Sequence, residues 1–243
     1  MFRVKICGVT TPEDASMVAD AGADAVGLNF VAGSPRRLDP ARARDVAAAL
    51  PASVLRVGVF AGLPGAEVAA IADAVGLDAI QFHGHLARPV TGRGADPWDP
   101  PEACVAVAPR PVIRAVRLDA DGPAARSLDR ARTWLRAAGA AGAPVAMLLV
   151  DAGAPPGREG PLGGTGRVVD WQRLVDAGPV GVPLTLAGGL TPQNVAAAIR
   201  GTGVAAVDTA SGVESSPGRK ERRLAVEFVR AALAAFAAAR GSV

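Results

Sequence analysis

Short apolar runs alternate with alanine-rich segments along nearly all of the 243-residue chain. The runs are continuously apolar, which is typical of parallel strands that are covered on both faces. The segments between them are long enough for crossover helices. Eight runs fit this description: 3–7, 25–30, 54–60, 79–82, 112–117, 146–150, 184–186 and 204–207. The alternation predicts an α/β protein, a single (βα)8 TIM barrel of eight parallel strands over residues 1–243.

Two helices are expected to begin with the same capping pattern. Thr11 precedes Pro12 and Thr191 precedes Pro192, so each site offers a capping hydroxyl and then a proline at the first helical position. The last helix should pack against the barrel wall, because apolar residues recur in it every four positions. These residues are Leu224, Phe228, Ala232 and Phe236.

Two segments interrupt the alternation of strands and helices. The proline-rich segment 85–101 has no apolar periodicity, so it is interpreted as a loop insertion. The glycine-rich segment 153–166 directly follows a strand end and is interpreted as a mobile lid.

The composition argues against nucleic acid as a partner. Hydrophobic residues make up 50% of the chain and charged residues 20%, as in ordinary globular proteins. The formal net charge is +3, but basic residues alternate with acidic ones, as in 39–45 and 214–227. Aromatic residues are 4% of the chain and tyrosine is absent, which leaves few platforms for stacking bases.

Cysteine and membrane signals point to a soluble protein of the cytoplasm. Cys7 and Cys104 are too few for a disulfide framework, and no Cys/His cluster suggests a metal. No apolar run approaches the ~20 residues that cross a bilayer, and the N-terminus has no apolar signal core. We therefore expect no metal, no cofactor and no membrane partner, and either a monomer or a homodimer.

A cysteine and an aspartate close two of the predicted strands. Cys7 ends the first strand and Asp151 directly follows the sixth. In a parallel barrel both side chains emerge at the same rim, where one can donate a proton while the other removes one. A lone cysteine at a strand end is more often a small buried hydrophobe, and an aspartate there often caps the next turn. The pairing nevertheless suggests an acid/base enzyme.

Glycine-bearing turns follow the last two strands. Gly188 and Gly189 follow the seventh strand, and Ser211 and Gly212 follow the eighth. Barrel enzymes often hold a phosphate with backbone N–H groups from these two loops. Each glycine pair alone could simply satisfy a tight turn. Together they predict a phosphate site, to which Gly164, Thr165 and Gly166 could add a third edge.

Motifs along nearly the whole chain resemble the phosphoribosylanthranilate isomerase family. The early ones are KICG at 5–8, GLNF at 27–30, SPRR at 34–37, VGVF at 57–60 and QFHG at 81–84. The later ones are LVD at 149–151, GGTGR at 163–167, AGGL at 187–190 and VDTASGVE at 207–214. One departure is His85, where the family usually has an acidic residue.

The resemblance implies an Amadori rearrangement in tryptophan biosynthesis. The substrate would be N-(5-phosphoribosyl)anthranilate and the product a carboxyphenylamino-deoxyribulose phosphate. Asp151 would be the general acid and Cys7 the general base. Because a free thiol has a pKa of about 8.5, Cys7 would have to be partly ionised by its surroundings.

The resemblance also implies substrate-binding residues. Arg36 would bind the anthranilate carboxylate, whereas Arg37 could simply face solvent. His83 could orient the substrate or form a hydrogen bond within the pocket. Asp208 would lie near the sugar hydroxyls, although it could equally stabilise its own turn. Lys5 is left outside the catalytic pair, since it could assist the thiolate or belong to an inner layer or ion pair of the barrel.

Rival functions make different predictions. A barrel that also isomerises the related histidine-pathway compound would resemble a family whose first-strand base is an aspartate, and Cys7 argues against it. A catalytically silent phosphate-binding barrel would lose the acid/base pair, and both of its members are present.

Overall fold

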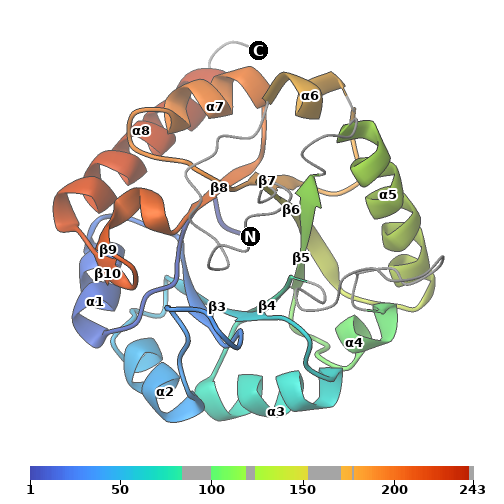
Figure 1. Cartoon of the computed structure of the whole chain (residues 1–243), viewed down its shortest axis with the longest axis horizontal. Helices are drawn as coiled ribbons and strands as arrows, with labels where there is room; N and C mark the ends of the chain where they lie inside the picture. Colours follow the sequence, from blue (N-terminus) through green and yellow to red (C-terminus); the bar gives the residue numbers. More distant parts are fainter. Residues whose placement is uncertain (84–99, 119–123, 153–170, 177, 241–243) are drawn as a thin grey trace.

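The computed structural model describes residues 1–83, 100–118, 124–152, 171–176 and 178–240. Eight parallel strands close into a barrel in chain order, and helices surround it (Figure 1). The strands are β1 (Val4–Cys7), β2 (Ala25–Asn29), β3 (Leu55–Phe60), β4 (Ala79–Phe82), β5 (Val112–Leu118), β6 (Val145–Ala152), β7 (Leu184–Leu186) and β8 (Ala206–Thr209). The predicted fold class is confirmed.

The helices lie between the strands, as the alternation predicts. They are α1 (Pro12–Asp20), α2 (Pro40–Ala48), α3 (Gly65–Val75), α4 (Pro101–Val105), α5 (Ala124–Ala140), α6 (Trp171–Asp176), α7 (Val195–Thr202) and α8 (Arg222–Arg240). After β8 the chain adds a short 3-10 helix, η1 (Ser211–Val213), and a two-stranded hairpin of β9 (Glu214–Ser216) and β10 (Arg219–Lys220) that the sequence did not predict.

The barrel closes between β8 and β1, where Lys5 is in register with Asp208 and Ile6 with Thr209. The sequence placed the eighth strand at 204–207, but the observed strand lies two residues further along the chain. Asp208 and Thr209 are polar and therefore did not extend the apolar run. They continue the strand because both side chains find polar partners inside the fold.

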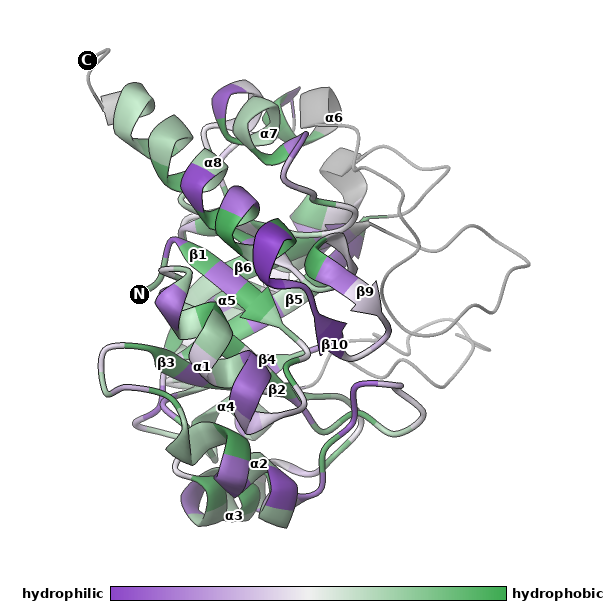
Figure 2. Ribbon diagram, turned by 90° about the vertical axis from the view of Figure 1, so that its left-hand side faces the viewer, coloured by the Kyte–Doolittle hydropathy of each residue, from purple (hydrophilic) through white to green (hydrophobic). Residues whose placement is uncertain are grey.

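Successive residues of each strand face opposite sides of the barrel wall. One buried cluster lies inside the barrel, since it joins residues of β2 to β8 around the ring, and it is rich in small side chains such as Ala25, Ala79 and Ala206. A larger cluster lies between the strands and the helices, and it includes Ile6. Hydrophobic residues predominate along the strands and much of α8 in Figure 2. Two apolar layers therefore support the barrel wall.

The predicted apolar stripe of the last helix is confirmed. Phe228, Ala232 and Phe236 are buried, and Leu224 packs against the same cluster with partial exposure. The stripe attaches α8 to the barrel beside α7 and α1.

The two predicted helix starts differ in the structure. Thr11 caps α1 as expected, because its hydroxyl accepts a hydrogen bond from the Asp14 N–H at 3.1 Å. The second prediction is wrong, since α7 begins only at Val195. Asn194 holds the preceding residues in a turn, with Oδ1 accepting from the Thr191 N–H at 2.8 Å and Nδ2 donating to the Gly189 carbonyl at 2.9 Å.

The predicted lid, 153–166, lies outside the described residues, as do residues 85–99 of the predicted insertion. The end of that insertion is helical rather than loop, because Pro101 is the first residue of α4. Within the described part of the chain, no helix combines the length and the apolar character that crossing a membrane requires.

Candidate active site

A pocket lies at the carboxyl ends of the strands and contains most of the predicted site residues. Cys7, Arg36, His83, Asp151, Asp208, Gly188, Gly189 and Ser211 all line it. Gly212 lies in the same loop as Ser211 but does not line the pocket, and Gly164, Thr165 and Gly166 lie outside the described residues. The pocket also includes residues that the sequence reasoning did not single out, namely Asn29, Gln81, Arg117 and Thr209.

The two proton-transfer candidates come from strands that are not neighbours. Cys7 ends β1, and Asp151 lies near the end of β6, so β7 and β8 separate them around the ring. Parallel strands carry both side chains to the same mouth of the barrel. The pocket therefore brings together the thiol and the carboxyl group that the sequence paired.

The thiol of Cys7 is buried and is not part of a disulfide. Burial raises the pKa of Cys7, and the positive charges of Lys5 and Lys220 oppose this rise without reversing it. The protonated thiol is therefore the resting form near neutral pH, in contrast to the partly ionised group that the sequence reasoning required.

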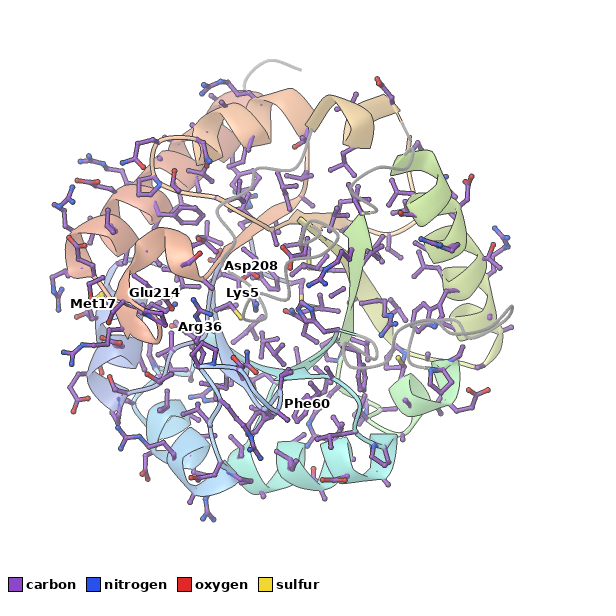
Figure 3. The ribbon with its side chains drawn as sticks, in the orientation of Figure 1. Lys5, Met17, Arg36, Phe60, Asp208 and Glu214 are labelled. Carbon is purple, nitrogen blue, oxygen red and sulfur yellow. The ribbon has the colours of Figure 1, made fainter. Side chains whose placement is uncertain are left out.

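Lys5 and Asp208 form a buried ion pair inside the barrel, with 2.8 Å between Nζ and Oδ1. Figure 3 shows the two side chains together within the ring of strands. Burial alone would lower the pKa of Lys5, but the Asp208 carboxylate outweighs it and raises the pKa. Of the alternatives for Lys5, the structure shows an ion pair, and Asp208 is held by a neighbouring strand rather than by its own turn.

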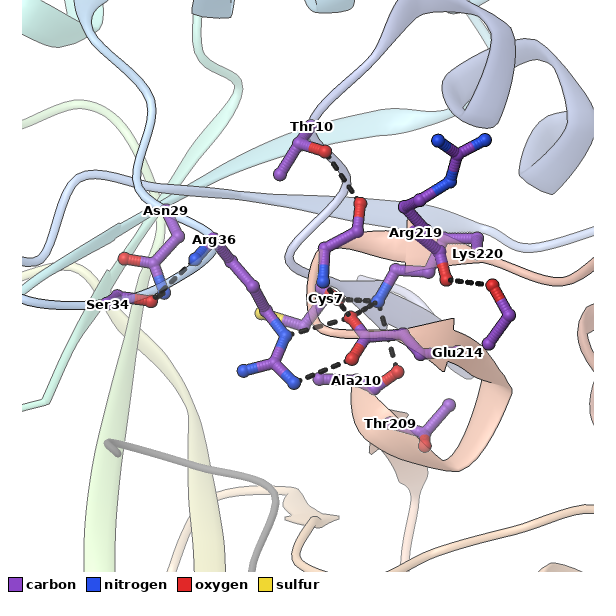
Figure 4. A network of polar contacts seen from close by, with 12 residues as sticks. Cys7, Thr10, Asn29, Ser34, Arg36, Thr209, Ala210, Glu214, Arg219 and Lys220 are labelled. Carbon is purple, nitrogen blue, oxygen red and sulfur yellow. Dashed lines mark hydrogen bonds and ion pairs between the residues drawn. The ribbon is translucent and has the colours of Figure 1, made fainter. Parts of the chain in front are cut away.

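Arg36 is buried and is held by a carboxylate from the far end of the sequence. Its Nε and Nη2 donate to the two carboxylate oxygens of Glu214, at 2.8 and 2.6 Å (Figure 4). Burial would raise the pKa of Glu214, but the hydrogen bonds from Arg36 and the charge of Lys220 lower it. Arg37, by contrast, is exposed, as expected. The ionised carboxylate fixes the orientation of the Arg36 guanidinium at the pocket.

Lys220 connects this pair to the first strand. Its ammonium donates to Glu214 Oε1 at 2.7 Å, to the Cys7 carbonyl at 2.6 Å and to the Ala210 carbonyl at 3.0 Å (Figure 4). Burial lowers the pKa of Lys220, yet three acceptors match the three donors of a protonated amine. Arg36, Glu214 and Lys220 together carry two positive charges and one negative charge, which leaves one unbalanced positive charge beside the pocket.

Sequence reasoning missed Glu214 and Lys220, although a signal was present. The chain has only two lysines, Lys5 and Lys220, and the sequence reasoning considered only the first. Both are buried. Buried lysines are rare unless they are paired, so a lysine retained in an arginine-rich chain marks a specific position.

His83 follows β4 and lies on the same face as Gln81. The Gln81 Nε2 atom is 2.6 Å from His83 Nε2. Burial, together with the positive charges of Lys5, Arg117 and Arg114, lowers the pKa of His83 to about 3. The imidazole is therefore neutral at physiological pH, and its Nε2 lone pair can accept the N–H of Gln81.

The two loops that were predicted to bind phosphate pack directly against each other. Gly188 and Gly189 have φ angles of 86° and 67°, in the left-handed region that favours glycine. A Cβ atom on Gly212 would lie 1.8 Å from the Leu190 carbonyl oxygen, so the β8 loop passes directly against the β7 loop. The Thr209 hydroxyl donates to the same oxygen at 2.8 Å. This arrangement supplies closely spaced backbone groups beside the pocket.

Within the described part of the chain, no group of three His, Cys, Asp or Glu side chains could hold a metal ion.

A closed (βα)8 barrel with a polar pocket at the carboxyl ends of its strands has the architecture of a barrel enzyme. The model of the N-(5'-phosphoribosyl)anthranilate isomerase family matches residues 4–92 and 119–231. The chain belongs to this family.

Individual relatives match along nearly their whole length. The N-(5'-phosphoribosyl)anthranilate isomerase of Acidithiobacillus ferrooxidans is 44% identical over 229 residues, which are 94% of this chain and 96% of the relative. The crystal structure of the Thermotoga maritima enzyme is 34% identical, with a TM-score of 0.76 over 96% of this chain and 100% of that one. A phosphoribosylanthranilate isomerase in complex with reduced 1-(o-carboxyphenylamino)-1-deoxyribulose 5-phosphate is 32% identical, with a TM-score of 0.70 over 96% and 100% of the two chains.

The depressed pKa of His83 predicts an acid-sensitive fold. Unfolding returns the imidazole to its ordinary pKa of about 6.5, so the unfolded state binds more protons and stability falls as the pH falls below that value. Between about pH 7 and about pH 5.5 we expect His83 to contribute a loss of about 1 kcal/mol in the free energy of unfolding. Denaturant unfolding of the wild type and of His83→Asn measures it. Carboxylates titrate in both proteins, so equal pH slopes in the two would contradict the assignment.

Proposed function

We propose that Asp151 is the general acid and Cys7 the general base in the isomerisation of N-(5'-phosphoribosyl)anthranilate to 1-(2-carboxyphenylamino)-1-deoxyribulose 5-phosphate, a step of tryptophan biosynthesis. The observation that carries the proposal is that the thiol and the carboxyl group line one pocket at the mouth of the barrel. Membership of the isomerase family supports the reaction, and the motifs that bear Cys7 and Asp151 support the two roles.

The reaction needs one proton donated and another moved. Asp151 protonates the ring oxygen of the ribose as the bond from C1 to that oxygen breaks, and the bridging nitrogen supplies electrons to form a protonated imine. The Cys7 thiol releases its proton to solvent, and the thiolate removes the proton from C2. The electron pair of the C2–H bond forms a C1–C2 double bond as the imine becomes an amine. The enol becomes the product when the C2 hydroxyl loses its proton and C1 gains one, so atoms and charge balance.

The resting thiol fits this sequence of events. In the free enzyme burial holds the pKa of Cys7 above its ordinary value. A protonated imine next to the thiol adds a positive charge at the moment when the thiolate is needed, and opposite charges favour ionisation. Lys5 and Lys220 act in the same direction as that charge. Coupling the base to the ring-opened substrate also keeps a reactive thiolate from accumulating in the empty enzyme.

The ends of the substrate carry negative charge, and each has a matching region of the pocket. The backbone N–H groups of the β7 and β8 loops, at Gly188, Gly189, Ser211 and Gly212, would bind the phosphate, with Gly164, Thr165 and Gly166 as a third edge. Arg36 would bind the anthranilate carboxylate, which would neutralise the unbalanced positive charge of the Arg36, Glu214 and Lys220 cluster.

Asp208 and His83 would contact the sugar. The Asp208 carboxylate lines the pocket while it is held by Lys5, so an oxygen on a rigid group is available to a sugar hydroxyl. The ring of His83 lines the pocket as well, and its Nε2 atom faces Gln81. Direct contact between His83 and the substrate stays a prediction.

Domain organisation, assembly and location complete the proposal. Residues 1–243 would form one barrel domain with a loop insertion near 85–101, and the match of one family model on both sides of 93–118 supports the single domain. The chain would be a monomer or a homodimer, since one solved relative is described as monomers made from a dimeric isomerase of Thermotoga maritima. A biosynthetic family fits a cytoplasmic enzyme.

Removing either proton-transfer group should greatly lower the turnover rate. We expect Cys7→Ser and Asp151→Asn each to lower kcat by at least ~10²-fold, the usual scale for a general acid or base. Loss of the anthranilate-type fluorescence of freshly made substrate measures the rate. Cys104→Ala, in α4, and Asp45→Asn, exposed on α2, are matched controls that should leave the rate unchanged. Full activity in either site variant would exclude its assigned role.

Adjacent arginines give a matched test of carboxylate binding. Arg36→Met should raise KM by about tenfold to a hundredfold, because a charge-assisted hydrogen bond contributes about 1.5–3 kcal/mol. Arg37→Met removes the same charge from an exposed neighbour and should leave KM unchanged. Steady-state kinetics on both variants compares them. Equal KM values for the two variants would show that Arg36 does not bind the substrate.

A further inference from the structure

One buried polar atom in the pocket has no partner. Gln81 lies in β4 with only 1% of its surface exposed, and its side chain lines the pocket with Cys7 and Asp151. Its Oε1 atom accepts no hydrogen bond from any residue that the structure describes. A buried acceptor left without a donor costs about 1–3 kcal/mol, and folded proteins rarely leave one unsatisfied. The Oε1 atom of Gln81 is therefore open to a donor from a bound ligand.

The orientation of the amide is fixed from the other end. The Nε2 atom of Gln81 lies 2.6 Å from Nε2 of His83. A neutral imidazole that accepts this N–H carries its own proton on Nδ1, so Oε1 is the amide atom that remains unpaired. The strand neighbours of Gln81 in register, Val59 and Ile113, are apolar and offer no side-chain donor. His83 is a positioning residue for this amide.

Only part of the substrate can satisfy Oε1. The phosphate and the anthranilate carboxylate are acceptors at neutral pH, so neither can donate to an amide oxygen. The remaining donors are the N–H that bridges the aromatic ring to C1 and the hydroxyls of the sugar. C1 and C2 must lie within reach of both Cys7 and Asp151 for the proton transfers, and the same pocket contains Gln81.

We propose that Gln81 is a further substrate-binding residue, whose Oε1 accepts a hydrogen bond from a donor at the reacting end of the sugar, the bridging N–H or the C2 hydroxyl. This inference rests on the proposed function. No protein group that the structure describes competes with the substrate for this oxygen. The contact also discriminates between ligands, since a molecule without a donor at this position leaves the oxygen buried and unpaired.

Two related ligands and one variant test the proposal. The product has a carbonyl at C2, and its reduced form has a hydroxyl there, while both keep the bridging N–H. Binding of each to the wild type and to Gln81→Met is measured by calorimetry, with thermal unfolding of the ligand-free proteins alongside. Gln193→Met, at an exposed position outside the pocket, is the matched control and should bind as the wild type does.

We expect Gln81→Met to bind the reduced product about tenfold more weakly than the wild type. Its ligand-free unfolding temperature should stay within a few degrees of the wild type, because methionine fills similar space and removes the unpaired oxygen, while His83 loses the N–H donor of Gln81. A larger loss for the reduced product than for the product assigns the contact to the C2 hydroxyl. Equal losses assign it to a donor that both ligands keep, such as the bridging N–H.

Unchanged affinity of Gln81→Met for both ligands would overturn the proposal. A large fall in its ligand-free unfolding temperature would also count against it, since the amide would then serve the fold. Gln81→Glu is the second variant, because a buried carboxylic acid can donate to His83 and still present a carbonyl oxygen. We expect its affinity to stay within about threefold of the wild type, and a loss equal to that of Gln81→Met would contradict the role of Oε1.

Measurements of binding and activity on the wild type distinguish a failure of this inference from a failure of the proposed function. A wild-type protein that neither binds the reduced product nor isomerises the substrate would reject the proposed function itself. A wild type that does both, beside an unaffected Gln81→Met, would reject the role of Gln81 alone.

Discussion

Closure of the sheet between its first and last strands is the constraint on which the rest of the structure depends. The pairing of β1 with β8 turns eight strands into a ring, and only a ring brings the ends of β1 and β6 to one mouth. A polar contact stabilises this closure, because Lys5 and Asp208 are register partners and also form an ion pair. The pair belongs to the barrel and to the pocket at once, so the same contact that closes the fold fixes one wall of the site.

Two charged clusters at the pocket have different roles. The Lys5 and Asp208 pair is electrically balanced, and breaking such a buried pair from one side leaves an uncompensated charge that typically costs about 3–5 kcal/mol. The Arg36, Glu214 and Lys220 cluster is unbalanced by one positive charge. A balanced pair suits a structural wall, whereas an unbalanced cluster suits the recognition of an anion. Charges from both groups act on Cys7, but burial outweighs them and raises the pKa of its thiol.

The alternation of apolar runs and helical segments predicted the barrel because that pattern is local in the sequence. The barrel then predicted that Cys7 and Asp151 share a mouth, since strand ends in a parallel sheet meet on one side. The end of β8 was misplaced because Asp208 and Thr209 are polar, and only their partners on β1 and in the β7 loop explain why they belong to a strand. Glu214 and Lys220 were missed for a related reason. Glu214 contacts Arg36, 178 positions away in the sequence, and Lys220 contacts Cys7, 213 positions away. No local sequence pattern predicts contacts over such separations.

Lys220 also bears on how the protein is made. Its amine holds the carbonyl of Cys7, a residue that leaves the ribosome more than two hundred positions earlier. Lys5 likewise has no ion-pair partner until Asp208 has been synthesised. During synthesis β1 is therefore made long before these partners, and a nascent chain that ends before Ala206 contains every barrel strand except β8, which completes the ring. A chain that ends before Lys220 therefore lacks the amine that binds the Cys7 carbonyl, and its site is incomplete.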